Sequence, residues 1–120
     1  MEVENIKFKA KSILDGAWVQ GDLIHKEDGK IAILRNGFNV SEVDPSTVCQ
    51  FTGLKDCKGN EIWEGDIVER ETYNLYKGYV KAKAVIEYSV GAFVAMVGIA
   101  PYPLCSQNIK VVGNKFDKEK

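Results

Sequence analysis

The chain has 120 residues, of which 45% are hydrophobic and 28% are charged, and its formal net charge is −1. This size and composition fit one compact soluble domain with its own core, and the charge excludes nucleic-acid binding by overall charge alone while leaving room for a local basic face. The three cysteines are odd in number and form no C-x-x-C pair, so neither a disulfide framework nor a cysteine zinc site is expected.

The sequence shows no secretion or membrane signal. The N-terminal stretch MEVENIKFKAK has charges but no apolar h-region. The longest apolar run, residues 90–100, contains two glycines and is far shorter than the ~20 residues that a membrane helix needs. We therefore expect a cytoplasmic protein without a membrane partner.

The first half of the chain reads as short strands separated by turn residues. Extended segments are predicted at residues 6–10, 16–24, 30–35 and 47–51. Asp28-Gly29 predicts a hairpin with a type I′ turn, because this pair tolerates positive φ. Asn36-Gly37 ends the next strand, and Asp44 begins a turn or caps a short helix.

The second half continues in the same way. Extended segments are predicted at residues 67–70, 79–88, 92–97 and 109–113. In the clearest of them, one face carries Val80, Ala82, Ala84, Ile86 and Tyr88. The opposite face carries Lys81, Lys83 and Glu87, with Val85 as the exception. Pro101 and Pro103 are expected to break any regular element.

These patterns predict the fold class. No segment has a sustained 3.6-residue apolar period, and short strands with glycine turns indicate a small barrel or sandwich. We predict an all-β, single-domain fold, a small and partly open β-barrel of the Src-homology-3-like group. Residues 1–114 would form the domain and residues 115–120 a charged tail.

The segment 52–68, TGLKDCKGNEIWEGDIV, is the most informative part of the chain. Its three glycines supply positive φ at turns, and Asp56 and Asp66 are placed to bond nearby backbone N–H groups. Ile62, Ile67 and Val68 are expected in the core, and Trp63 is expected to be partly exposed. Turn chemistry explains these residues, so we interpret the segment as structural.

Five segments carry a family resemblance: IKFKAK, GAWVQGDLI, TVCQFTGLKDCKGNEIWEGDIV, VIEYSVGAFV and IKVVGN, in this order. In them the chain resembles the YopX family of phage and prophage proteins. The resemblance implies a small β-rich protein without an established enzymatic activity, for which nucleic-acid binding has been suggested, and it offers no catalytic residues. The motif residues that it singles out, interpreted as structural, are Thr52, Gly53, Leu54, Lys55, Asp56, Gly59, Glu64, Gly65 and Asp66.

Catalytic chemistry is not indicated. His25 is the only histidine, and the chain has neither a nucleophile motif nor a phosphate-binding glycine loop. We therefore expect no enzyme, no cofactor, no metal site and no small-molecule substrate. One local acidic group, which matches no metal loop, is interpreted as a solvated rim rather than a cation site: Glu61, Glu64, Asp66 and Glu69.

The segment 70–83, RETYNLYKGYVKAK, is the best candidate for a binding site. Its tyrosines can stack on bases while its basic residues contact phosphates, which is how single-stranded DNA or RNA is held without sequence readout. The candidate residues are Arg70, Tyr73, Tyr76, Lys77, Tyr79, Lys81 and Lys83. The alternative is an exposed hairpin whose tyrosines shield a core edge, and the small size of the patch favours it.

A second function class is a protein-interaction or assembly module. The apolar run at residues 93–99 exceeds what one strand face buries, so it could line the interface of a homo-oligomer. An exposed edge strand could serve the same purpose.

Overall fold

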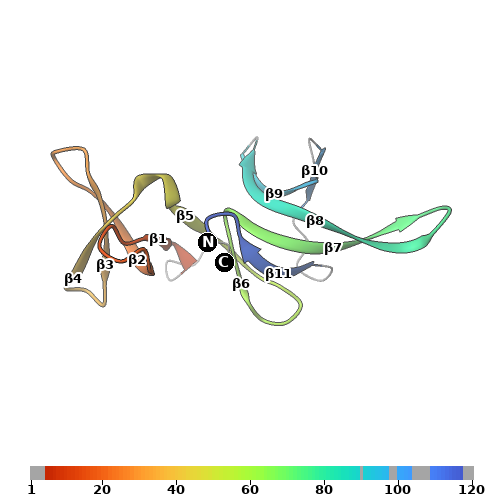
Figure 1. The fold of residues 1–120 in the computed structure, drawn as a ribbon, viewed down its shortest axis with the longest axis horizontal. Helices are drawn as coiled ribbons and strands as arrows, with labels where there is room; N and C mark the ends of the chain where they lie inside the picture. Colours follow the sequence, from red (N-terminus) through yellow and green to blue (C-terminus); the bar gives the residue numbers. More distant parts are fainter. Residues whose placement is uncertain (1–4, 90, 98–99, 104–108, 118–120) are drawn as a thin grey trace. The chain divides into compact units, whose positions relative to one another are not determined.

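The computed structural model describes residues 5–89, 91–97, 100–103 and 109–117 (Figure 1). Within these ranges the strands form two antiparallel sheets and no closed barrel, and no α-helix occurs. The prediction of an all-β, partly open fold is therefore confirmed. The chain divides into two compact units, Met1–Phe51 and Thr52–Lys120.

The first unit is built from four strands and the start of a fifth, which are β1 (Phe8–Lys11), β2 (Trp18–His25), β3 (Ile31–Arg35), β4 (Asn39–Val43) and β5 (Cys49–Lys55). Their hydrogen-bonded order is β4-β3-β2-β1-β5. After β1, an isolated bridge joins Ser12 to Val43, and Asp44 N–H donates to the carbonyl of Lys11 at 2.9 Å. The chain thus returns to β4, and the strands curl into a partly open barrel.

Apolar residues from alternate positions fill this barrel. Ala10, Ile33 and Val43 are buried there, as the alternation of side chains along a strand requires. The partly buried residues that pack against them are Phe8, Val19, Leu23, Ile31 and Val48. The 3₁₀ helix η2 (Pro45–Thr47) leads toward β5 and is capped by Asp44, whose Oδ1 accepts from Ser46 N–H at 3.0 Å. The predicted cap is therefore confirmed.

The second unit contains the end of β5 and a five-stranded sheet. Its further strands are β6 (Glu61–Trp63), β7 (Asp66–Asn74), β8 (Gly78–Ser89), β9 (Ala92–Val97), β10 (Ala100–Pro103) and β11 (Ile109–Asn114). The sheet has the order β10-β9-β8-β7-β11, and β6 is the hydrogen-bonded neighbour of β5. The core consists of Ile62, Val68, Ala84, Ile86, Ala95 and Ile109. Phe93, Val97 and Val111 pack against it.

The alternation predicted for residues 79–88 is confirmed. Ala84 and Ile86 are buried on the apolar face, whereas Lys81, Lys83 and Glu87 are exposed on the other. Tyr88 stays 59% exposed, with its ring edge-to-face against Phe93 at a centroid distance of 5.3 Å.

Two local predictions were wrong, and one strand was missed. Pro101 and Pro103 do not end regular structure, because they lie in β10 at the edge of its sheet, where a strand tolerates residues without an N–H. Trp63 is buried at 5% exposure, not partly exposed, on the strand β6 that pairs with β5. β4 was not predicted, because its sequence NVSEV has only two apolar residues.

The turn types also differ from the prediction. Asp28 has no positive φ, and only Gly29 does (φ 86°), so this hairpin turn is not type I′. The two-residue turn with positive φ at both positions is Asn36-Gly37 (φ 54° and 80°), closed by Phe38 N–H on the carbonyl of Arg35 at 3.2 Å. Both hairpins form, but the turn with two positive φ values is the one at Asn36-Gly37 and not the one at Asp28-Gly29.

Candidate nucleic-acid interface

The β7–β8 hairpin extends beyond the sheet that anchors it (Figure 1). Among the described residues, β11 pairs with β7 only up to Arg70, and β9 pairs with β8 only from Val85 onward. Residues 71–81, called the arm below, therefore pair only with each other in this part of the chain. A short loop, residues 75–77, joins the two strands, and Gly78 follows it with φ 78°.

The tip of the arm is apolar and exposed. Leu75 is 84% exposed and Tyr76 is 95% exposed. Tyr79, at the start of β8, is 72% exposed. Such large exposed side chains on neighbouring positions form an available contact surface, since apolar residues gain free energy when they are removed from water.

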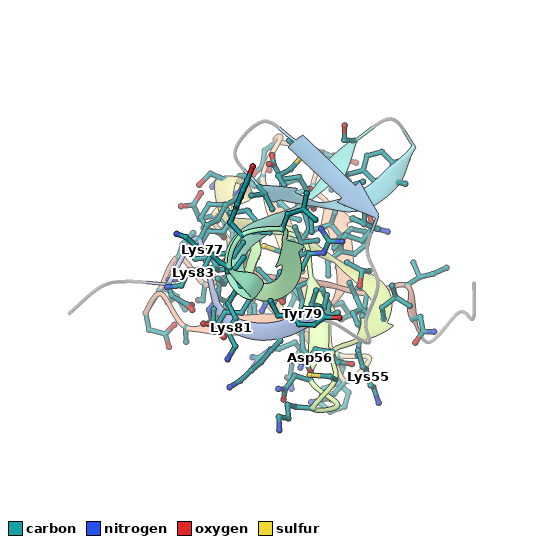
Figure 2. The ribbon with its side chains drawn as sticks, turned by 90° about the vertical axis from the view of Figure 1, so that its right-hand side faces the viewer. Lys55, Asp56, Lys77, Tyr79, Lys81 and Lys83 are labelled. Atoms are coloured by element: carbon teal, nitrogen blue, oxygen red, sulfur yellow. The ribbon has the colours of Figure 1, made fainter. Side chains whose placement is uncertain are left out.

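Three lysines accompany these rings. Lys77 lies in the loop, and Lys81 and Lys83 follow along β8, all of them exposed. Figure 2 looks at the arm end-on and shows these lysines and Tyr79 pointing outward around it. The arm thus combines aromatic rings and cations, which is the pairing that contacts with bases and phosphates require.

The strand register places acidic residues opposite lysines of β8, which the sequence alone did not show. Lys83 lies directly opposite Glu69, and Lys81 lies opposite Glu71. Lys110 of β11 also lies opposite Glu69. Opposite charges at facing positions of a sheet attract each other, so the charge of Lys83 is partly compensated by Glu69 rather than simply added to that of its neighbours.

The other predicted residues are placed differently. Arg70 lies opposite Ala82 and Ile109, on the strand face next to the core, and is half-buried. Tyr73 lies opposite Tyr79 in the register, and its side chain is outside the described part. The structure therefore brings Tyr76, Lys77, Tyr79 and Lys81 onto the arm, places Lys83 at its base, and separates Arg70 from them.

Sequence reasoning did not single out Leu75. In the sequence it is one apolar residue between polar and aromatic neighbours, and its exposure follows from its place in the loop of an arm beside which no third strand pairs within the described residues. The signal that could have found it is the loop composition, since hairpin loops usually carry polar residues.

The family motif lies elsewhere in the second unit, and its first half forms a turn around Asp56. The Asp56 carboxylate, 6% exposed, accepts hydrogen bonds from the backbone N–H groups of Lys58 (2.9 Å), Asn60 (2.8 Å) and Val111 (2.8 Å). Burial acts to raise the pKa of this carboxyl, but the hydrogen bonds from Val111, Asn60 and Lys58 outweigh it and lower the pKa. The turn is thereby tied to β11.

The second half of the motif centres on Asp66, which is 2% exposed. Its two oxygens accept from Trp63 N–H at 2.8 Å and from Asn114 Nδ2 at 2.9 Å. Gly65 N–H donates to the carbonyl of Ile86 at 2.7 Å. These bonds join the bend before β7 to β8 and β11.

The remaining motif residues serve the same turns. Thr52 Oγ1 donates to the carbonyl of Ile62 at 2.7 Å, which joins β5 to β6. Gly53, Gly59 and Gly65 all have positive φ, between 85° and 87°. Leu54 and Lys55 are exposed, and Glu64 is half-buried.

Metal and thiol chemistry gain no support from the geometry. Among the residues described, no group of three or more histidine, cysteine or carboxylate side chains is placed to hold a metal ion. His25 is exposed, Cys49 is buried and Cys57 is exposed, while Cys105 lies outside the described ranges. In the same ranges no helix is long and apolar enough to cross a bilayer.

Comparisons with known proteins place the chain in a family. No curated protein matches it. A family model described as YopX protein matches residues 2–119, which is nearly the whole of the 120-residue chain. The chain therefore belongs to the YopX protein family.

Proposed function

We propose that this protein is a non-enzymatic accessory protein of phage or prophage origin that acts in the cytoplasm and binds nucleic acid through the arm. The observation that carries the proposal is the exposure of Tyr76, Lys77, Tyr79 and Lys81 on a hairpin that extends beyond its sheet within the described residues, with Lys83 exposed at its base. Rings of this kind stack on bases, and lysines beside them neutralise phosphates. Single-stranded DNA and RNA are the ligands that the sequence predicts.

The charges of the arm favour the binding of a polyanionic ligand over the pairing of β8 with a strand from another chain. The outer edge of β8 is open from Gly78 to Ala84 among the described strands, and open edges invite pairing with another chain. Lysines on an edge strand oppose such pairing, and Lys81 and Lys83 lie on this open edge of β8. A polyanion, in contrast, is attracted by them.

The test is fluorescence anisotropy with labelled single-stranded DNA, single-stranded RNA and duplex DNA, each at low and at physiological salt. The expected result is binding that weakens as salt increases. Replacing Lys77, Lys81 and Lys83 together by alanine should lower the slope of log K against log salt by about 2, since each phosphate contact contributes roughly 0.7–0.9.

A matched control removes the same charge elsewhere. Lys55, Lys58 and Lys115 are exposed and lie outside the arm, so their joint replacement by alanine should leave the affinity nearly unchanged. If both triple variants weaken binding equally, the arm is not the site. If no nucleic acid binds at low salt, the proposed function is wrong.

A second candidate function, self-assembly, is favoured by the edge of the first unit. Residues 39–41 of β4 carry no charge, and in the described part no strand pairs with their outer side. Val40 is 57% exposed there, and Phe38 beside it is 79% exposed. This is the composition of an edge that can add a strand from a second copy.

Light scattering after size exclusion tests this candidate. If β4 mediates assembly, the wild type is an oligomer and Val40→Lys converts it to a monomer, whereas Val112→Lys, at an exposed apolar position of β11, does not. A wild-type monomer at high concentration would remove the candidate. Phe93 is a poor site for this test, because it packs against the core of the second unit.

A further inference from the structure

We infer that the nucleic acid held by the arm is duplex DNA, and that Leu75 and Tyr76 insert between stacked base pairs and kink the duplex. This inference rests on the proposed function and specifies its ligand. It starts from the two most exposed neighbouring residues of the hairpin, Leu75 at 84% and Tyr76 at 95%.

The dimensions of the arm fit a groove. Its two strands are about 4.8 Å apart, and a two-stranded ribbon enters the ~12 Å wide major groove of B-DNA. Residues 71–74 add about 13 Å to the hairpin at roughly 3.3 Å per residue. Because the major groove is about 8.5 Å deep, the tip can reach the base pairs before the sheet meets the phosphates.

The tip has the chemistry of a wedge. Proteins that kink DNA from the minor groove insert apolar side chains between base steps, and partial unstacking is compensated by the contacts that the bend allows; we infer the same insertion here from the major-groove side. Leu75 supplies the apolar group, and Tyr76 supplies a ring beside it. The register pairs Asn74 with Gly78, and Gly78 takes the left-handed conformation that closes the loop, so the tip is a defined turn rather than a free segment.

A single strand fits this geometry less well. Single strands are held by successive bases stacked along a basic groove. Here Tyr76 lies at the end of a narrow ribbon, and Tyr79 lies on the strand behind it. The two tyrosines therefore lie one behind the other along the arm and do not form a row of stacking platforms in a groove.

The charges give the expected salt dependence. Lys81 and Lys83 lie on β8, set back from the tip, where phosphates at the groove edge would meet them. Glu69 lies opposite Lys83, so only part of the charge of Lys83 is available to phosphates. We therefore expect the insertion of Leu75 and Tyr76 to contribute as much to the duplex affinity as the contacts between lysines and phosphates.

The experiment uses the full chain and a 20-base-pair duplex with a central TA step, which kinks easily, and with donor and acceptor dyes at its two ends. The wild type should raise energy transfer, as a kink of about 20–90° brings the ends together. Leu75→Ala/Tyr76→Ala should abolish this rise and weaken the duplex affinity about tenfold, the loss of roughly one stacking contact.

Two further variants make the result specific. Tyr76→Phe keeps the ring and should keep the bend. Phe38→Ala removes another highly exposed apolar residue (79%) beside a different hairpin turn and should leave the bend and the duplex affinity unchanged. Thermal unfolding of each variant shows whether the fold is intact.

The outcomes separate the two proposals. Tighter binding to single strands, or duplex binding without a bend, overturns this inference and leaves the proposed function in place. Absence of salt-dependent binding to every nucleic acid overturns the proposed function as well. A wild-type dimer that Leu75→Ala/Tyr76→Ala dissociates, with no DNA binding, identifies the tip as a self-association surface and overturns both.

Discussion

The Asp56 carboxylate accepts a hydrogen bond of 2.8 Å from the backbone N–H of Val111, which lies 55 positions further along the chain. The same side chain closes its own turn through Lys58 and Asn60. One buried carboxylate therefore links a local turn to the last strand of the second unit. Its removal should destabilise the whole unit and not only the turn.

Replacing Asp56 by alanine should lower the free energy of unfolding by about 3 kcal/mol, because three backbone N–H groups lose a charged acceptor. Urea unfolding followed by circular dichroism measures this loss. Asp28→Ala is the control, since Asp28 accepts one backbone N–H, from Lys30, at an exposed turn. Equal effects of the two substitutions would contradict the role assigned to Asp56.

The stability of the protein should depend on Asp56 at acid pH. Its pKa in the folded chain lies below the ordinary value of 3.8, so its contribution to the unfolding free energy is complete above that pH. The contribution is lost as the pH falls from there through the folded pKa. Urea midpoints between pH 7 and pH 2 should therefore fall less steeply in Asp56→Asn than in the wild type, and parallel curves would refute the assignment.

Gly21→Ala should destabilise the first unit by more than about 2 kcal/mol. A Cβ at Gly21 would lie 2.1 Å from the carbonyl oxygen of Leu34, in the backbone of the neighbouring strand. At Gly113 the nearest atom, Asp117 Oδ2, would be 3.8 Å away, so Gly113→Ala should be close to neutral. Thermal unfolding of both variants checks this contrast.

Substitutions at the tip of the arm should not affect folding. Because Leu75 and Tyr76 are almost fully exposed, Leu75→Ala/Tyr76→Ala should change the unfolding free energy by no more than about 0.5 kcal/mol. Ile86→Ala, in the buried core of the same strand pair, should cost about 2–5 kcal/mol. A large loss for the tip variant in urea unfolding would show that the tip is packed rather than available.

Local features could be predicted where the conformation of a residue depends only on its neighbours in the sequence. The alternation along residues 79–88, the cap at Asp44 and the positive φ of Gly53, Gly59 and Gly65 all follow from side-chain period or turn chemistry. The type of turn at Asp28-Gly29 was less predictable, because an Asp-Gly pair fits more than one hairpin geometry.

Other features depended on partners far away in the chain. Trp63 is buried at a position where its own segment predicts partial exposure, whereas its neighbour Ile62, on the other face of β6, joins the core of the second unit. β10 is a strand despite its prolines because it occupies a sheet edge. Lys83 meets Glu69 through a register that spans the hairpin.

The sequence by itself determined an all-β protein of the YopX family, since strand period, turn glycines and the motif at residues 52–68 are local signals. Only the tertiary structure decided that residues 71–81 leave the sheet as an arm. The physical reason is that exposure depends on which strands lie beside a hairpin, and within the described residues neither β9 nor β11 pairs with the arm.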